Sequence, residues 1–327
     1  MSDGTTSTAR VAMADTGDAM PIEEPAWPVM VLAHNEERHI GACLESIFES
    51  EPGRAFDVFV MANGCTDGTE QIVQQHAERR PGIHLISIAL GDKCNAWNVF
   101  IHETMPRHAA SRPIYFFMDG DARIAAGSLS VMANALASNA HAHAASAVPI
   151  SGRNAGRDRR EIIEQHGLVA NLYALRGSFA ERLRLEDVRI PLKLEGDDGL
   201  IGALVKWDLD PQHNSFDDLR IVPCADAGFA FDSMSLTRPA DWKLYWKRAV
   251  RYGRRRYEFK LLGPRIERAG LSAMPRDITE LYPEAAQLRL MWDGLYTISN
   301  WVALRAMRSD ALSVASRLRS ATRTKAN

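Results

Sequence analysis

The sequence predicts an α/β fold in which a mainly parallel sheet is covered by helices and is followed by a helical C-terminal extension. Between Pro28 and about residue 150, short apolar runs alternate with amphipathic stretches of helical length, a pattern typical of parallel strands joined by helices. Polar clusters follow these apolar runs, and ligands bind beyond the carboxyl ends of the strands in such sheets. The extension is expected because helical patterns dominate the second half of the chain.

Five strands are expected in the first half, because each segment is short, apolar and rich in β-branched or aromatic residues. They comprise residues 28–33, 56–62, 83–89, 113–118 and 142–150. The stretches between the first four strands carry apolar residues at helical spacing. These expected helices comprise residues 36–50, 67–79 and 92–105.

The second half of the chain is predicted to be mainly helical. Residues 157–185 predict one or two amphipathic helices, and residues 196–207 predict a helix capped by an aspartate. Residues 221–231 predict two short strands. Helices are expected again at residues 240–262, which are strongly basic, and at residues 284–308.

Composition excludes several classes of protein. The 327 residues carry a formal net charge of −2, and because binding to nucleic acid needs a surplus of basic residues, no nucleic-acid partner is expected. No apolar run reaches the roughly 18 residues of a membrane-spanning helix. The four cysteines lack CxxC spacing, which favours a reducing compartment and therefore the cytoplasm. Residues 1–27 lack the features of a signal peptide and are expected to be a disordered leader.

Polar clusters follow the first three expected strands, with the sequences AHNEE (33–37), ANGCTDGT (62–69) and GDKCNAWN (91–98). Helix capping and turn chemistry explain much of the first two clusters. Lys93 is different, because a cation at a helix start is disfavoured by the helix dipole. We therefore expect Lys93 to be a partner for a phosphate group.

The fourth expected strand ends in FMDGDARI (117–124), which places Asp119 and Asp121 on one turn. Two such carboxylates can converge on one hard cation, as Mg²⁺ and Mn²⁺ prefer, with waters and substrate phosphates as the other ligands. A lone DxD is a weak signal, and the same residues could be a polar turn. Four polar clusters at four strand ends are a stronger signal.

Taken in order, HNEE, NGCTDGT, GDKCNAWN and DGDA resemble the motifs of the family 2 glycosyltransferases of the GT-A (Rossmann-like) type, over residues 28–125. The resemblance implies a nucleotide-sugar donor whose diphosphate is bridged by Mn²⁺ or Mg²⁺. It implies that Asp121, helped by Asp119, is the metal ligand. It also implies the following nucleotide-sugar-binding residues: Asn35, Glu37, Asn63, Asp67, Lys93, Asn98 and Asp119.

Ala62 departs from the family pattern, which often has an acid there to bind the base of UDP. The family resemblance favours a UDP-sugar as donor, and the missing acid at Ala62 leaves GDP and dTDP carriers as alternatives. Composition and patterning along the chain divide it into a leader, a catalytic domain, a helical basic extension and a basic tail. Their bounds are 1–27, 28–235 (nucleotide-binding half 28–125, acceptor half 126–235), 236–310 and 311–327.

LEGDDGLIGALVKW (194–207) carries the candidate catalytic base. One aspartate suffices to cap a helix, so the second of Asp197 and Asp198 needs another explanation. Inverting sugar transfer requires a carboxylate that takes the proton of the acceptor hydroxyl. The segment is similar to the acidic pair of the family, which implies Asp198 as the base and Asp197 as the alternative.

Residues 242–260 form a basic stretch interleaved with aromatic residues. It could be a solvated helical face, or Arg248, Arg251 and Arg255 could bind the diphosphate or an acceptor phosphate. Contact of residues 243–268 with anionic lipid at the inner face of a membrane is a further alternative.

Two smaller sets are expected to be structural: His141 and His143 as surface or core histidines, and Trp207, Trp242, Trp246 and Trp292 as core residues.

These observations favour a metal-dependent inverting glycosyltransferase that moves a sugar to a hydroxyl acceptor, which could be lipid-linked. Such an enzyme would act in the synthesis of a polysaccharide, a glycolipid or another glycoconjugate. Two alternatives are a nucleotidyltransferase on a similar sheet and a non-catalytic protein that binds nucleotide sugars.

Overall fold

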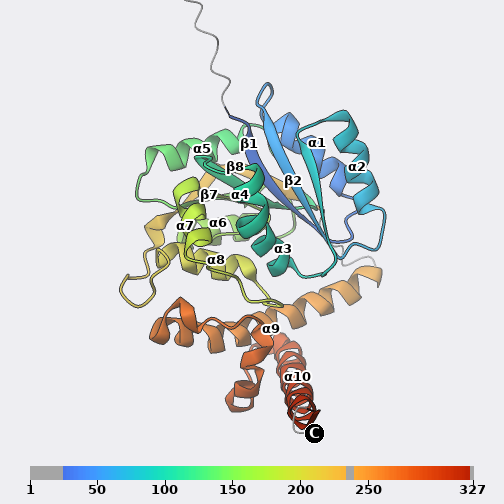
Figure 1. Ribbon diagram of the computed structural model, residues 1–327, viewed down its shortest axis with the longest axis vertical. Helices are drawn as coiled ribbons and strands as arrows, with labels where there is room; N and C mark the ends of the chain where they lie inside the picture. Colours follow the sequence, from blue (N-terminus) through green and yellow to red (C-terminus); the bar gives the residue numbers. More distant parts are fainter. Residues whose placement is uncertain (1–24, 233–238, 325–327) are drawn as a thin grey trace, which may run out of the picture.

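The computed structural model describes residues 25–232 and 239–324. Most of the leader expected at residues 1–27 therefore lies outside the described residues. One sheet of eight strands, in the order β3-β2-β1-β4-β7-β6-β8-β5, organises the described chain. Helices cover both faces of this sheet (Figure 1).

The first half of the sheet confirms the expected parallel arrangement. Strand β1 pairs in parallel with β2 and β4, and β2 pairs in parallel with β3. These strands are Trp27–Ala33 (β1), Phe56–Asn63 (β2), Ile83–Ile88 (β3) and Ile114–Asp119 (β4). The helices that join them are Ile40–Ser50 (α1), Thr69–Arg79 (α2) and Lys93–Val99 (α3), the last continued by a π-helix, Phe100–Thr104, and by Met105–His108 (α4). Because all four strands run the same way, the four predicted motifs lie at one edge of the sheet.

The second half of the sheet is mixed. Strand β7 is antiparallel to both of its neighbours, β4 and β6, while β8 is parallel to β6 and antiparallel to β5. These strands are Ala122–Ile124 (β5), Ala144–Pro149 (β6), Leu172–Arg176 (β7) and Ile221–Phe231 (β8). The helices among them are Ser128–Ser138 (α5), Ala155–Gln165 (α6), Gly177–Leu185 (α7) and Asp197–Lys206 (α8), with a 3₁₀ turn at Asp218–Arg220.

Two sequence predictions for this half were wrong, and one helix was missed. Residues 157–185 do not form helix alone, because buried Leu172–Leu175 insert as a central strand between β4 and β6. Residues 221–231 form one continuous strand, and the irregularity lies in its pairing, where the register with β6 shifts between Ser146 and Val148. Helix α5 was not expected.

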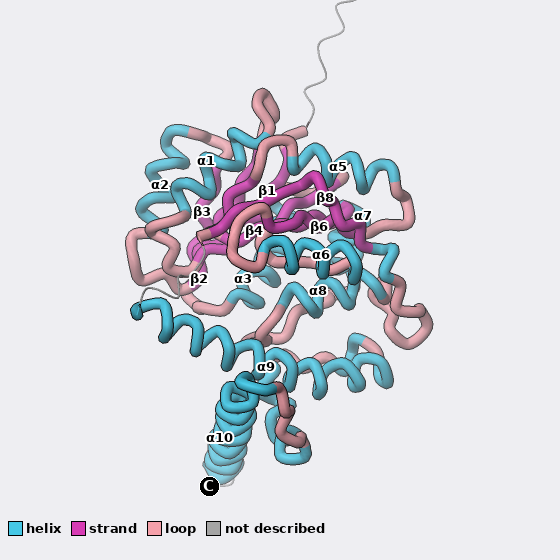
Figure 2. The backbone as a smooth tube through the Cα atoms, turned by 180° about the vertical axis from the view of Figure 1, so that it is seen from behind, coloured by secondary structure: helices cyan, strands magenta, loops and turns pink. Residues whose placement is uncertain are grey.

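The C-terminal part consists of two long helices and the short turns between them. Figure 2 shows α9 (Pro239–Ala269) lying across the α/β body on the side of α8, with α10 (Thr297–Thr324) extending away from it. The helix expected at 284–308 begins later, because 3₁₀ helices at Leu271–Ala273, Ile278–Gln287 (η4) and Gly294–Tyr296 (η5) precede α10. None of the described helices is both long and apolar enough to cross a membrane.

The C-terminal helices share the core of the α/β body. One face of the sheet carries a cluster that includes Trp97, Phe117 and Tyr173, and the same cluster contains Tyr257 and Ile266 of α9. The rings of Phe117 and Tyr173 stack with centroids 4.8 Å apart. The opposite face packs a second cluster against α1, α2 and α5. Helix α9 is therefore fixed relative to the sheet by buried contacts.

Candidate active site

A cleft of about 1110 Å³ opens where the strand ends face α9. Its walls come from the start of α3, the turn after β4, helix α6, the segment 195–199 and one face of α9. It brings together eight of the predicted site residues: Lys93, Asp119, Asp121, Asp197, Asp198, Arg248, Arg251 and Arg255. Residues far apart in the sequence thus line a single site.

Lys93 joins two acidic segments of this cleft. Asp92 accepts a hydrogen bond from the backbone of Asn95 and caps α3, so Lys93 begins the helix and points to the strand ends. Its Nζ atom lies 2.9 Å from Asp119 Oδ1 and 3.5 Å from Asp197 Oδ2. Burial alone would lower the pKa of Lys93, but the charges of Asp119 and Asp197 outweigh it and raise the pKa well above its ordinary value. Lys93 therefore stays charged in the cleft.

The turn formed by residues 119–121 carries two carboxylates, of which only one is paired with a basic side chain among the described residues. Gly120 donates a backbone hydrogen bond to Leu32 O at 2.8 Å, which holds the turn against β1. Asp119 is paired with Lys93, whereas Asp121 forms no ion pair with any basic side chain in the described part of the chain. Burial, and then the charge of Asp119, raises the pKa of Asp121. A cation placed at Asp121 would relieve both effects.

The residues at this turn can supply some, but not all, of the ligands of a hard divalent cation. Within residues 25–232 and 239–324, no group of three or more His, Cys, Asp or Glu side chains is arranged to hold a metal ion. Asp121, with the oxygen of Asp119 that does not face Lys93, supplies one or two carboxylate ligands. Mg²⁺ and Mn²⁺ sites that use one or two carboxylates are completed by waters and substrate phosphates. The donor set therefore fits the predicted Mn²⁺ or Mg²⁺.

The segment before α8 presents two aspartates to the cleft. Gly196, rather than an aspartate, occupies the N-cap position of α8, so Asp197 and Asp198 both lie in its first turn. Gly196 has φ +89°, and a Cβ atom there would lie only 2.4 Å from Nε of Arg255. Only glycine allows this close approach of α9 to the segment.

Asp197 and Asp198 have different partners. Asp197 faces Lys93, while Asp198 Oδ1 lies 3.2 Å from Nη1 of Arg255 and accepts a hydrogen bond from the backbone of Gly199. Burial raises the pKa of Asp198, and Asp197 raises it further, while Arg255 opposes both effects. A carboxylate with a raised pKa is a better proton acceptor, which is the property required of a general base.

Helix α9 turns one basic face into the cleft. Arg248, Arg251 and Arg255 lie at helical spacing and line the cleft together with Lys247. Arg251 Nε lies 3.0 Å from Glu195 Oε2, and Arg248 Nε donates to the hydroxyl group of Tyr252 at 2.9 Å. This part of the basic stretch is therefore a wall of the cleft and not only a solvated face.

Five predicted site residues lie outside the lining of the cleft and connect loops. Asn35 Oδ1 accepts from Thr66 N at 2.8 Å, Glu37 Oε2 accepts from Gly68 N at 3.0 Å, and Asp67 Oδ2 accepts from Glu37 N at 3.1 Å. These three bonds join the loop after β1 to the loop after β2.

The other two of the five residues make buried hydrogen bonds. Asn63 donates to Ala33 O at 2.8 Å, which fixes the end of β2 against β1. The side-chain amide of Asn98 donates to Ile190 O at 2.8 Å and accepts from Ile190 N at 2.9 Å. Asn98 thereby fastens α3 to a segment 92 residues away.

Glu258 is a site residue that the sequence analysis missed. Its side chain is fully buried beneath the cleft. Oε2 accepts a hydrogen bond from Glu195 N at 2.8 Å, and Oε1 accepts one from the hydroxyl group of Tyr282 at 2.6 Å. Burial raises the pKa of Glu258 to about 7. The only available signal was an isolated acid within the basic stretch 242–260.

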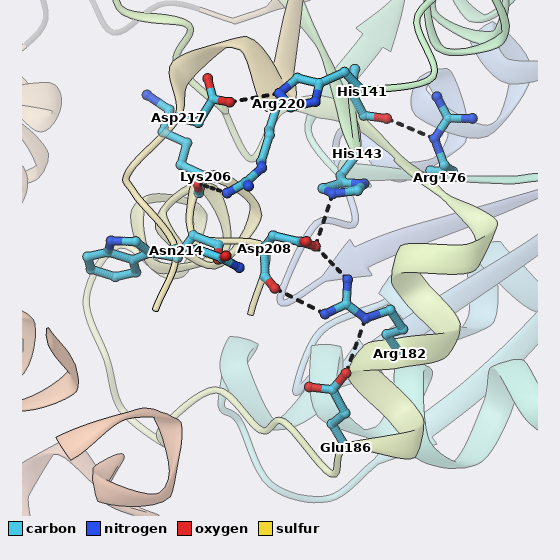
Figure 3. Close-up of polar contacts among 12 residues, drawn as sticks. His141, His143, Arg176, Arg182, Glu186, Lys206, Asp208, Asn214, Asp217 and Arg220 are labelled. Carbon is cyan, nitrogen blue, oxygen red and sulfur yellow. Dashed lines mark hydrogen bonds and ion pairs between the residues drawn. The ribbon is translucent and has the colours of Figure 1, made fainter. Parts of the chain in front are cut away.

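His141 and His143 belong to a separate polar network, as expected for structural histidines (Figure 3). His141 Nε2 lies 2.7 Å from Asp217 Oδ2, and His143 Nε2 lies 3.0 Å from Asp208 Oδ1. Asp208 also pairs with Arg182. These residues do not line the cleft.

Comparison with known proteins identifies related families and folds. The family profile described as "Glycosyl transferase family 2" matches residues 29–192. A mannosyltransferase from Pyrobaculum calidifontis, solved in complex with GDP-Man and Mn²⁺, superposes with a TM-score of 0.55 at 19% identity, covering 89% of this chain and 88% of that one. At that identity the likeness concerns the fold. No curated protein sequence matches the chain at a significant level.

Two further solved structures superpose with lower scores. Glucosyl-3-phosphoglycerate synthase from Mycobacterium tuberculosis, in complex with phosphoglyceric acid, gives a TM-score of 0.46 at 17% identity over 67% of this chain and 74% of that one. S. aureus TarS 1-349, in complex with UDP-GlcNAc, gives a TM-score of 0.46 at 15% identity over 89% and 92%.

Proposed function

Because this chain belongs to glycosyl transferase family 2 and is a glycosyltransferase with a GT-A fold, we propose that it moves one sugar from a nucleotide-diphosphate sugar to a hydroxyl acceptor, with inversion at the anomeric carbon and with the help of a divalent cation. The observation that supports this proposal most directly is the joint placement of Asp121, Lys93 and Asp198 in one cleft. These residues supply a cation site, a phosphate partner and a proton acceptor.

The donor diphosphate would lie between Asp121 and the basic residues of the cleft. When bound at Asp121, Mn²⁺ or Mg²⁺ would offset the charge that develops on the leaving diphosphate. Lys93 and the guanidinium groups of Arg248 and Arg251 line the same cleft and would bind phosphate oxygens. The mannosyltransferase from Pyrobaculum calidifontis, which was solved with GDP-Man and Mn²⁺, supports a nucleotide sugar as donor.

Asp198 is the proposed general base. The hydroxyl oxygen of the acceptor forms a bond to the anomeric carbon, the bond from that carbon to the phosphate oxygen breaks, and Asp198 takes the hydroxyl proton. Burial raises the pKa of Asp198, which supports this role. Asp197 is held toward Lys93 and is the alternative base.

The carrier nucleotide and the acceptor are named by chemical class. The family resemblance favours a UDP-sugar as donor. GDP or dTDP carriers are the alternatives, because buried Ala62 offers no carboxylate to the base at the end of β2. The acceptor is a hydroxyl compound, and a lipid-linked one would suit an enzyme at the inner face of a membrane. The four cysteines carry no disulfide, which supports the cytoplasm.

Release of nucleoside diphosphate tests the proposed function. Purified protein is incubated with UDP-, GDP- and dTDP-sugars and a panel of acceptors, with Mn²⁺, with Mg²⁺ and with EDTA. We expect nucleoside diphosphate to be released with one donor class, and the release to stop with EDTA and in Asp121→Ala. The matched control is Asp226→Ala, since Asp226 is an exposed acid on β8 outside the cleft. Release of pyrophosphate instead would favour a nucleotidyltransferase, and failure to bind any nucleotide diphosphate would refute the proposal.

A further inference from the structure

The start of α10 and the turn before it expose a group of large apolar side chains, which we call the α10 apolar face. It consists of Trp292, Leu295, Tyr296, Ile298, Trp301 and Leu312. Trp292 is 85% exposed and Leu295 is 93% exposed, so the expectation that Trp292 is a core residue was wrong. Several large apolar side chains that gather on one surface indicate an interaction site.

The α10 apolar face is opposite the side of α10 that packs on the protein. Ile298, Trp301 and Leu312 recur at helical spacing on the outer side of the helix, whereas Asn300 and Ala303 on the inner side approach Gly253 of α9. Exposure of these residues is thus a consequence of how α10 is docked.

Polar contacts hold this surface in place. Arg256 of α9 lies 2.7 Å from Asp293 and donates to Asn300 Oδ1 at 2.7 Å. Asn300 in turn donates to Met291 O at 3.1 Å. The backbone on both sides of Trp292 is therefore anchored, while its side chain projects outward. The surface is preformed rather than a loose segment.

The segment that carries this face is basic in sequence. Residues 239–327 contain 18 Lys and Arg and 8 Asp and Glu, a net charge of +10, although the whole chain carries −2. Arg305 lies over the Trp301 ring at 5.3 Å from its centroid, within the face itself. The partner of such a surface must therefore be negatively charged and must also accept aliphatic side chains.

We propose that the α10 apolar face docks on the surface of an anionic lipid bilayer. Trp and Tyr favour the membrane interface, Leu and Ile favour the acyl boundary, and basic residues are attracted to an anionic surface. A nucleic acid would leave the exposed Leu295, Ile298 and Leu312 without apolar partners. A symmetric pair of chains would bring two segments of charge +10 together.

This inference deepens the membrane contact in the proposed function and places it on a different surface from residues 243–268. Many basic side chains of that segment are paired, as Arg251 is with Glu195, Arg255 with Asp198 and Arg265 with Glu284. The contact surface is instead the α10 apolar face, which lies outside the cleft. Membrane docking and donor binding can therefore occur at the same time.

Vesicle co-sedimentation tests the inference without any sugar transfer. The full chain is mixed with vesicles of phosphatidylcholine alone or with phosphatidylglycerol added. We expect binding that depends on phosphatidylglycerol, weakens with salt, and falls at least about tenfold in Trp292→Ser/Leu295→Ser. The matched control is Leu185→Ser/Leu219→Ser, which removes two exposed leucines from the α/β body and should bind like the wild type. Brominated lipid should quench tryptophan fluorescence in the wild type and much less in Trp292→Phe/Trp301→Phe, which removes both tryptophans of the face.

Three outcomes would overturn the inference. The first is that the wild type does not bind anionic vesicles, and the second is that Trp292→Ser/Leu295→Ser binds them as well as the wild type does. The third is that light scattering shows a dimer that the double variant dissociates, which would make the face a protein interface. Failure of the proposed function is distinct, since donor hydrolysis without vesicles would then be absent in the wild type while vesicle binding persists.

Discussion

Arg255 of α9 lies 3.2 Å from Asp198 at the start of α8, measured from Nη1 to Oδ1. A helix from the C-terminal extension thus sets the charge environment of the proposed base. The first prediction concerns Arg255→Ala. Because the guanidinium group favours the ionised carboxylate, its removal should raise the pKa of Asp198 further. The acidic limb of the pH profile of kcat should therefore move to higher pH.

The matched control for Arg255→Ala is Arg265→Ala, which lies on the same helix outside the cleft and pairs with Glu284. Its pH profile should match that of the wild type. If Arg255→Ala lowers kcat at every pH but leaves the acidic limb of the profile in place, Arg255 acts on the donor and not on Asp198.

The second prediction separates the two candidate bases. Asp198→Asn should lower kcat by about 10²–10⁴-fold, since general base catalysis contributes that much. Asp197→Asn should act mainly on donor binding, because Asp197 faces Lys93 rather than Arg255. Steady-state kinetics with saturating acceptor measures both effects. The opposite order, with kcat lost in Asp197→Asn, would assign the base to Asp197.

The third prediction concerns Lys93, whose ammonium group lies between the carboxylates of Asp119 and Asp197. Lys93→Ala leaves Asp119 and Asp197 without the ammonium group that separates them, and it removes a phosphate partner. The affinity for the nucleotide sugar, measured by calorimetry with Mn²⁺ present, should fall about tenfold or more. Lys193→Ala removes a similar charge that pairs with Asp277 outside the cleft, and it should leave the affinity unchanged. Equal loss in both variants would speak against a role for Lys93 in donor binding.

The fourth prediction concerns the buried side chain of Glu258. The pKa of Glu258 is raised from 4.5 to about 7 in the folded protein. The folded state therefore keeps a proton that the unfolded chain loses, so the contribution of Glu258 to stability is present below pH 4.5 and is lost as the pH rises to about 7. A shift of this size corresponds to roughly 3 kcal/mol in the free energy of unfolding.

Glu258→Gln cannot ionise, so the decline in the free energy of unfolding between pH 4.5 and 7 should be shallower in this variant than in the wild type. Denaturant unfolding at a series of pH values measures the decline. Glu267→Gln, on the same helix but exposed, is the control. A wild-type decline that is unchanged in Glu258→Gln would show that another group titrates in this range.

The first four strands and the residues that follow them could be predicted because a parallel strand buried on both faces is a continuous apolar run. The parallel order then places Lys93, Asp119 and Asp121 at one edge of the sheet. Strand β7 could not be predicted with the same rule, since Leu172–Arg176 is only five residues long and stands between two amphipathic stretches. Its partners β4 and β6 decide its conformation.

The role of Glu258 depends on contacts that no local pattern records. Its two hydrogen-bond partners lie 63 residues before it and 24 residues after it. The exposure of Trp292 has a similar origin, since its neighbours Met291 and Asp293 are held by Asn300 of α10 and Arg256 of α9, which are distant in the sequence. Both findings required the tertiary arrangement.

Tyr257 and Ile266 of α9 are packed in the same core as Trp97 of α3 and Phe117 of β4. This packing bears on how such an enzyme could acquire a new acceptor. A helix that only rested on the catalytic domain could be exchanged as a module between relatives. Here a replacement for α9 would have to pack into the existing core with its inner side and, at the same time, line the cleft with different residues on its outer side. Change of acceptor should therefore proceed by single substitutions on the cleft side of α9, at positions such as Leu244 and Arg248, while its inner side stays constant.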